Sequence, residues 1–274
     1  MTSNIGKALL VALMLSASAC KSDGAGNLAD NAMNGAAPAN AANAATPAPD
    51  GETIAFEKDQ VEFRYSWPGA AAAIAPLAAS LRAEGEKLRK ETEEAGRKEQ
   101  ASAKEGGYPY RGYSLTQDWQ LAADLPALLV LQSEGYTFTG GAHGMPFVNT
   151  LLWDKAGGRR LALDALFDSA ALVNAIRARF CSALDAEREK RRGAPVDPNA
   201  SDGIPEFSRC VDPAKQVILP VSAGGRTLDT IRVVILPYEA GPYAEGIYQL
   251  DLPVDDAVRA AVKPAWRSAF GAGA

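Results

Sequence analysis

Hydrophobic and polar positions alternate where the folded part of the chain begins, near Thr53. Four large side chains share one side of this alternation: Val61, Phe63, Tyr65 and Trp67. A period of two is typical of a strand with one buried face. The sequence predicts that this strand ends at Pro68-Gly69.

A helical period replaces the alternation over residues 70–105. Apolar residues recur there at helical spacing: Ile74, Leu77, Leu81 and Leu88. Opposite charges four residues apart, such as Glu86 and Lys90, stabilise an exposed helix. The sequence predicts one long, solvated helix with a narrow apolar stripe, ended by Gly106-Gly107.

A second helix is predicted after a cap at Asp168 or Ser169. Its apolar residues recur every fourth position: Leu172, Ile176, Phe180 and Leu184. This spacing places them on one buried face. We expect the helix to fray from Glu187 and to end at Gly193, and we expect a short third helix over residues 254–262.

Short apolar runs separated by glycine-rich turns predict the remaining strands. They lie at residues 108–121, 128–139, 147–153, 160–163, 216–219, 229–236 and 248–252. Strands joined by short turns pair as an antiparallel meander. The predicted fold class is therefore α+β, an antiparallel sheet with packed helices.

The N-terminus has the pattern of a lipoprotein signal peptide over residues 1–19. Lys7 precedes an apolar run at residues 8–15, and small residues lead to Cys20. This run is too short to span a membrane. We expect cleavage before Cys20 and diacylglycerol on its sulfur, with ordinary signal cleavage as the alternative. Lys21 follows instead of Asp, which resembles the sorting pattern of outer-membrane lipoproteins. In an envelope with two membranes, we therefore expect the protein on the periplasmic face of the outer membrane.

Residues 20–52 are predicted to form a disordered tether. Positions 21–50 hold eleven Ala, five Asn, three Gly and three Pro, with no aromatic residue. Such a composition buries too little apolar surface to offset the entropy lost on ordering. The folded part is thus expected to stand away from the membrane that holds Cys20.

Composition excludes several classes of function. The chain has 28 basic and 33 acidic residues, a net charge of −5. This lacks the basic excess that nucleic-acid binding requires, so no nucleic-acid partner is expected. A single His excludes metal centres that need two or three imidazoles. The sequence predicts no metal and no cofactor.

Cys181 and Cys210 remain once Cys20 is assigned to the lipid. In an exported chain, two such thiols are most simply a disulfide that ties the second predicted helix to the loop after it. The alternative is a thiol nucleophile, for which only the distant His143 offers a base.

Four segments of the chain resemble a known family: Tyr136-Thr-Phe-Thr-Gly-Gly-Ala-His-Gly144, Gly158-Arg-Arg-Leu-Ala-Leu-Asp-Ala-Leu-Phe167, Pro237-Tyr-Glu-Ala-Gly-Pro-Tyr-Ala-Glu-Gly246, and Pro253-Val-Asp255. They resemble an exported family of unknown function. It includes the extracytoplasmic module of the lysozyme-sensing anti-sigma factor RsiV and the accessory module of the peptidoglycan deacetylase PdaC. The resemblance implies an α+β module with an N-terminal half at residues 53–146 and a C-terminal half at 147–274.

The candidate binding residues come from these motifs: Gly140, Gly141, His143, Gly144, Tyr238, Gly241, Pro242 and Tyr243. His143 is expected to close its glycine-rich turn by a hydrogen bond, or to act as a general base. Tyr238 and Tyr243 are expected to fill packing sites, or to stack on sugar rings.

Two functions from different classes follow. The first is a non-catalytic, lipid-anchored module of the cell envelope that binds a muramidase-like protein or peptidoglycan, since an acidic protein suits cationic muramidases. The second is an envelope hydrolase with His143 as general base. Replacing His143 by Ala separates them, because only a catalytic role loses turnover without losing stability.

Overall fold

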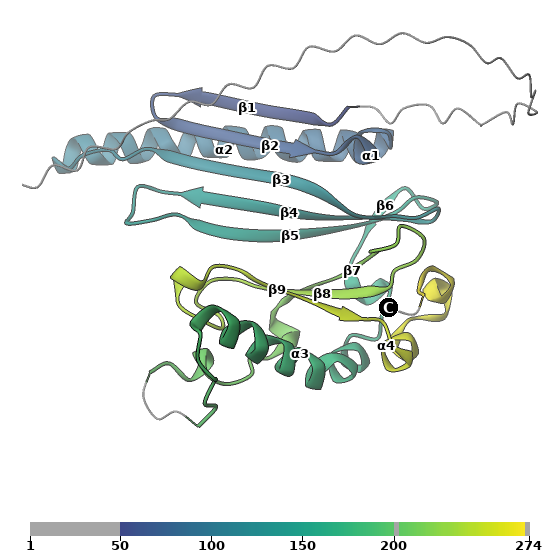
Figure 1. Cartoon of the computed structure of the whole chain (residues 1–274). Coiled ribbons are helices and arrows are strands. Elements are labelled where there is room, and N and C mark those ends of the chain that lie inside the picture. Colours follow the sequence, from purple (N-terminus) through teal and green to yellow (C-terminus); the bar gives the residue numbers. More distant parts are fainter. Residues whose placement is uncertain (1–49, 200–202, 272–274) are drawn as a thin grey trace, which may run out of the picture. The chain divides into compact units, whose positions relative to one another are not determined.

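The larger of two β-sheets has six strands in the order β1-β2-β3-β4-β5-β6 (Figure 1). The computed structural model describes residues 50–199 and 203–271, all within the unit Thr46–Ala274. The strands are β1 (Glu52–Lys58), β2 (Val61–Trp67), β3 (Tyr113–Asp124), β4 (Leu128–Phe138), β5 (Met145–Asp154) and β6 (Arg159–Leu161). The predicted signal peptide, the lipidation of Cys20 and nearly all of the predicted tether lie outside the described residues.

One pair in this sheet is parallel. Strands β2 and β3 run in the same direction, whereas the other neighbours are antiparallel. The helices α1 (Gly69–Ala72) and α2 (Ala75–Gly106) connect β2 to β3. This long helical crossover carries the chain from the end of β2 back to the edge of the sheet at which β2 began, so that β3 starts beside the start of β2 and the pair is parallel. The predicted α+β class is confirmed, with a sheet that is antiparallel apart from this pair.

The first predicted strand is a hairpin. Strands β1 and β2 pair along their whole length and are joined by Asp59 and Gln60, with φ angles of 53° and 62°. Left-handed backbone at both central positions matches the twist of a two-residue hairpin turn. The alternation identified β2 correctly. It did not reveal that the chain turns back between β1 and β2, because neither residue of the turn is a glycine.

Helix α2 packs on one face of the larger sheet. Its buried residues are Leu77, Ala78, Leu81, Gly85, Thr92, Gly96 and Ala103. They meet a cluster that includes Phe63, Tyr65 and Trp67 of β2. A Cβ at Gly96 would collide with the side chain of Val61, so glycine allows the helix to approach the sheet. The helix ends, as predicted, with Gly107 in the left-handed conformation.

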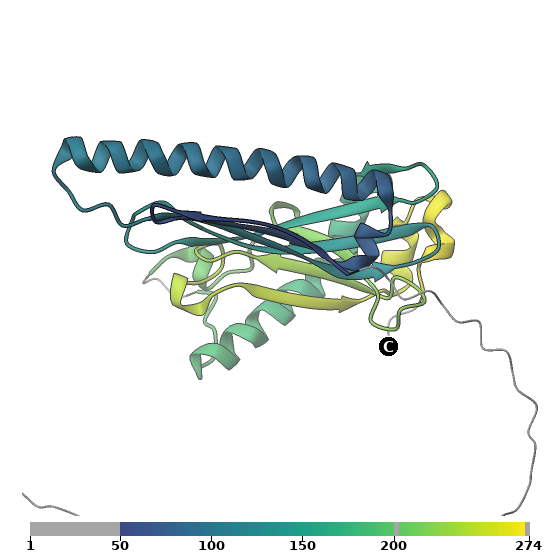
Figure 2. The same cartoon turned by 90° about the horizontal axis from the view of Figure 1, so that it is seen from above.

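A second, antiparallel sheet covers the other face. It comprises β7 (Val217–Val221), β8 (Thr230–Ile235) and β9 (Tyr248–Pro253). Helix α3 (Ser169–Arg192) lies beyond it, so that helix, sheet, sheet and helix follow one another as layers (Figure 2). Helix α4 (Asp256–Ala261) packs beside α3. Short 3-10 helices occupy Leu163–Ala165, Pro205–Phe207, Pro213–Lys215, Tyr243–Glu245 and Pro264–Ala269.

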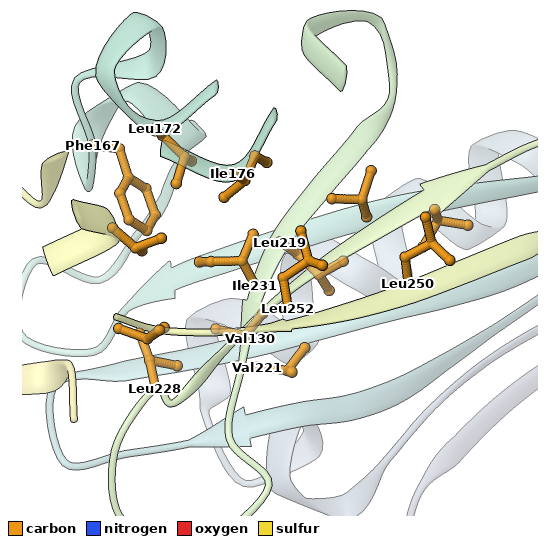
Figure 3. Packing of buried hydrophobic residues seen from close by; sticks show 14 of the residues in the cluster. Val130, Phe167, Leu172, Ile176, Leu219, Val221, Leu228, Ile231, Leu250 and Leu252 are labelled. Carbon is orange, nitrogen blue, oxygen red and sulfur yellow. The ribbon is translucent and has the colours of Figure 1, made fainter. Parts of the chain in front are cut away.

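Two sets of apolar side chains make the core around the smaller sheet. Leu172 and Ile176 of α3 lie over Ile231 (Figure 3). Val130 of β4 and Leu219 of β7 belong to the same cluster. The smaller sheet is therefore buried on both faces, which anchors its loops to the larger sheet.

Two chain-level observations complete the description. The predicted boundary between residues 146 and 147 falls inside β5. Among the described residues, no helix combines the length and the apolar character needed to cross a bilayer.

Candidate functional site

The two motif-bearing loops meet in space. The loop between β4 and β5 carries His143, and the loop between β8 and β9 carries Tyr238 and Tyr243. The His143 ring centroid lies 4.1 Å from that of Tyr243 and 6.4 Å from that of Tyr238. The rings of Tyr238 and Tyr243 are 5.8 Å apart. With Tyr136, which touches the same loop, these residues form what we call the aromatic cluster.

The backbone of Gly144 makes hydrogen bonds to three residues of this cluster. Its carbonyl oxygen accepts from the Tyr243 hydroxyl at 2.9 Å and lies 2.9 Å from His143 Nδ1. Its N–H donates to the Tyr136 hydroxyl at 3.0 Å. The backbone of one loop is thus held by side chains from both loops and from β4.

Position 144 requires glycine because neighbouring atoms leave no room for a side chain, and not because of its backbone dihedral angles. A Cβ there would collide with the ring of Tyr136 and come 2.5 Å from the Thr137 carbonyl oxygen. Gly140 differs, because its φ of +85° is left-handed. Gly141 has open space around it. The sequence motif therefore combines one glycine needed for close packing with one needed for backbone conformation.

Tyr238 is displayed to solvent in a strained conformation. Its φ is +72°, unusual for a bulky residue, and half of its surface (50%) is exposed. Its N–H donates to the Gly241 carbonyl at 2.9 Å, which closes a tight turn. Tyr136 is also exposed, at 40%. The packing role expected from the sequence for Tyr238 and Tyr243 does not describe the half-exposed Tyr238, whereas Tyr243 is partly buried.

His143 contacts both loops through its two ring nitrogens. With a proton on Nδ1, the ring donates to the Gly144 carbonyl, and Nε2 is free to accept from the Tyr238 hydroxyl at 3.3 Å. Desolvation and the neighbouring hydroxyls of Tyr136 and Tyr238 raise the pKa of Tyr243 above its ordinary value, which keeps it a donor. Within the described residues, no carboxylate hydrogen-bonds to His143.

Helix α3 holds the second loop in place. The Arg188 side chain is completely buried, and its guanidinium donates to the carbonyl oxygens of Ala240, Arg209 and Glu206. We expected this end of the helix to fray. It remains helical to Arg192 because its basic side chains are used as anchors.

Arg192 and Tyr248 both donate hydrogen bonds to the Glu245 carboxylate. Arg192 binds its carboxylate through Nε at 2.8 Å and Nη2 at 3.0 Å. Tyr248 also donates to it, and the Arg191 guanidinium lies 3.9 Å from the Tyr248 ring centroid. Burial raises the pKa of Glu245, but the hydrogen bonds from Arg192 and Tyr248 outweigh burial and lower it overall.

The remaining motif residues are divided between the two loops. Gly141 and Pro242 are exposed, whereas Gly241 is buried against Glu245, whose carboxylate occupies the space that a Cβ would need. All eight predicted motif residues therefore fall in the two loops that meet. Tyr136, Arg188 and Glu245 were missed as site residues. Tyr136 and Glu245 lie within the motif segments, but the role of Arg188 has no signal in the sequence.

The predicted disulfide is confirmed. Cys181 of α3 is bonded to Cys210, with their Cα atoms 5.3 Å apart. It fixes the segment whose carbonyls at Glu206 and Arg209 accept from Arg188. Among the described residues, no three His, Cys, Asp or Glu side chains are grouped to hold a metal ion.

A separate cleft of about 1030 Å³ lies beside β5 and β7. It contains none of the eight candidate binding residues, although Arg160 and Leu163 of the motif segment 158–167 line it. Its walls are Glu84, Trp119, Val148, Asn149, Thr150, Arg160, Leu163, Ser169, Ala170, Leu172, Val173, Asn174, Ala214, Gln216, Val217 and Ile218. These residues come from distant parts of the chain, so the sequence pattern did not indicate them.

Comparison with known proteins supports the predicted resemblance. Residues 54–146 match a protein-family model described as Deacetylase PdaC, so the resemblance to the PdaC module is confirmed over that part of the chain. No curated protein matches the sequence.

Two solved structures described as members of the DUF3298 family match most of this chain. One, from Pseudomonas aeruginosa PAO1, is 18% identical, with a TM-score of 0.45, over 82% of this chain and 98% of its own. The other, from Bacteroides fragilis NCTC 9343, is 15% identical, with a TM-score of 0.47, over 79% of this chain and 94% of its own.

Proposed function

We propose that this protein is a lipid-anchored binding module of the cell envelope and that the aromatic cluster is its ligand-contacting surface. One observation carries the proposal. Two loops 95 residues apart converge on His143 and Tyr238, and Tyr238 is held half-exposed at a positive φ. Exposed aromatic side chains on a rigid support supply large contact area at a low entropy cost.

The rigidity of the support favours binding. Arg188 and Arg192 hold the Tyr238 loop from α3, and Gly144 is packed beneath the His143 turn. Preorganised loops lose little freedom when a ligand arrives, which improves affinity. Strained backbone that is stabilised by its surroundings is also characteristic of functional sites.

A cationic muramidase-like protein is the ligand that the charge balance favours. The chain carries a net charge of −5, and the exposed Glu239 lies next to Tyr238. Electrostatic attraction raises association rates with basic partners. Peptidoglycan is the second candidate ligand, because aromatic rings such as those of Tyr136 and Tyr238 offer apolar faces to sugars.

The location is part of the same proposal. A diacylglycerol on Cys20 would hold the module at a membrane, and the tether would let it reach partners in the envelope. In an envelope with two membranes we place it on the periplasmic face of the outer membrane. Mass spectrometry of the native protein and fractionation of the membranes test this assignment.

Binding is tested with the full-length chain in detergent micelles, using hen-type lysozyme and purified sacculi as separate probes at low salt. We expect retention of the muramidase, and Tyr238→Ala should weaken it at least about tenfold. Leu121→Ala is the matched control, because Leu121 is similarly exposed (47%) and lies outside the cluster. Retention of neither probe, or equal binding by both variants, would contradict the proposal.

A hydrolase centred on His143 is the alternative. The 3.3 Å contact between His143 Nε2 and Tyr238 Oη is the feature that favours it. His143→Ala separates the two functions. Loss of turnover on sacculi with unchanged stability would support catalysis, whereas a lower melting temperature with retained binding would support the role in the turn.

A further inference from the structure

Two uncharged sheet edges face the same cleft. Strand β6 pairs only with Leu152, Trp153 and Asp154, so β5 has a strand partner on one side only from Met145 to Leu151. Strand β7 is the first strand of the smaller sheet and is likewise open on one side. Residues 148–150 of β5 and 216–218 at the start of β7 line the cleft of about 1030 Å³.

These edges differ from the edge at β1. Strand β1 carries Glu52, Glu57 and Lys58, charges of the kind that prevent a sheet edge from pairing with another chain. The open part of β5, residues 145–151, has no charged residue, and neither has β7. Each of these two edges holds one proline, Pro146 in β5 and Pro220 in β7, but residues 148–150 of β5, which line the cleft, include neither a proline nor a charge.

The open edge of β5 presents backbone groups to the cleft. The Asn149 N–H points towards β4, where it donates to the Ser133 hydroxyl at 3.1 Å. Backbone groups of successive strand residues point to alternate edges, so those of Val148 and Thr150 point away from β4. Leu152, two residues further on, is the residue that pairs with Leu161 of β6 on that side.

The two sides of the cleft differ in polarity. On the side of α3 and β7 the wall is largely apolar: Val148, Leu163, Leu172, Val173, Val217 and Ile218. On the side of α2 it holds Asn149, with Glu84 and Arg160 paired to each other at 2.6 Å. Because the two charges neutralise one another, the cleft favours an occupant that brings no net charge.

We propose that this cleft binds an extended, uncharged peptide segment of a partner protein, which adds a strand to the open edge of β5. Main-chain hydrogen bonds to Val148 and Thr150 would provide affinity, and apolar side chains at alternate positions would enter the wall of α3 and β7. This second site goes beyond the binding function proposed for the aromatic cluster.

A sugar polymer fits the cleft less well. Trp119 is the one aromatic residue among the described residues that line it, and Trp119 is 5% exposed. Its indole N–H already donates to the Tyr65 hydroxyl at 2.8 Å. The cleft therefore lacks an accessible stacking platform, whereas the open strand edge matches the spacing of a peptide backbone.

The test uses a phage-displayed library of linear random peptides of about nine residues, long enough to span the open edge. It is selected on the full-length chain, and the winning peptide is then synthesised. Ala170→Trp fills the cleft from an exposed position on α3, and Ala178→Trp adds the same side chain to an exposed position outside it.

We expect selected peptides with apolar residues at alternate positions and slowed amide exchange at Val148 and Thr150 on binding. Ala170→Trp should weaken binding at least about tenfold, and Ala178→Trp should not change it. Four results would overturn the proposal: no peptide of micromolar affinity, equal binding by both variants, selective binding of N-acetylglucosamine oligomers in the cleft, or self-association abolished by Ala170→Trp.

Discussion

Arg188 donates two hydrogen bonds to the carbonyl oxygen of Ala240, from Nε at 3.0 Å and from Nη2 at 2.8 Å. This contact joins α3 to the loop that carries Tyr238. A fully buried guanidinium is stable only when its donors are satisfied, and here three backbone carbonyls and Asp185 satisfy them. The position of the aromatic cluster thus depends on a residue outside both of its motifs.

Arg188→Met should strongly destabilise the protein. The change leaves the carbonyls of Ala240, Arg209 and Glu206 without their donors, at a cost of about 2–5 kcal/mol in the free energy of unfolding. Urea denaturation measures it. Lys190→Met is the control on the same turn, because that side chain is 77% exposed. Equal stability of the two variants would refute the anchoring role.

Gly144→Ala should disrupt the aromatic cluster. The added methyl group collides with the Tyr136 ring, so we expect a loss of about 1–3 kcal/mol and weaker ligand binding. Gly141→Ala, in the same loop but in open space, should remain close to wild type. Thermal unfolding of both variants checks this. A tolerated Gly144→Ala would show that close packing is not the reason for glycine there.

Glu245 should make the protein sensitive to acid. Hydrogen bonds from Arg192 and Tyr248 overcome the effect of burial and lower its folded-state pKa below the ordinary 4.5. The unfolded chain therefore binds the proton more readily, and the stabilisation present above that value is lost as pH falls through the folded-state pKa.

Urea denaturation between about pH 5 and pH 3 measures this loss. Glu245→Gln should be less stable near neutral pH and should lose less stability on acidification than wild type. Glu239→Gln alters an exposed carboxylate of the same loop and serves as control. If Glu245→Gln and wild type lose the same stability, this carboxylate does not carry the effect.

Reduction of the disulfide should lower stability. Cys181 and Cys210 are 29 positions apart, and closing a loop of that length removes about 3.5 kcal/mol of unfolded-state entropy. Urea denaturation with and without dithiothreitol should show this difference in the wild type. A Cys181→Ala/Cys210→Ala variant should be insensitive to the reductant. An unchanged wild-type transition would mean that the bridge adds no stability.

Much of the architecture was predictable because it depends on local patterns. Alternation identified β2, and apolar spacing identified α2 and the buried face of α3. Asp168 caps α3 as predicted, with its carboxylate accepting from the Ala171 N–H. Glycine ended both long helices as expected, at Gly107 and Gly193. The two cysteines left after Cys20, in a chain expected to be exported, were enough to predict the disulfide.

Other features had no local signal. The parallel pairing of β2 with β3 depends on where α2 docks, which its own residues do not reveal. The last turn of α3 looked like a fraying, charged end, because the partners of Arg188 and Arg192 lie on distant segments. The walls of the cleft beside β5 come from segments that lie far apart in the chain, from Glu84 in α2 to Ile218 in β7.

The sequence by itself determined which residues form the helices, most of the strands, the disulfide and the glycine-rich motifs, because hydrophobic period and backbone preference act over a few neighbouring residues. The tertiary structure decided that the His143 and Tyr238 loops meet, and that the open edges of β5 and β7 share a cleft. Those relationships depend on packing between segments far apart in the chain, where spacing along the sequence carries no information about distance in space.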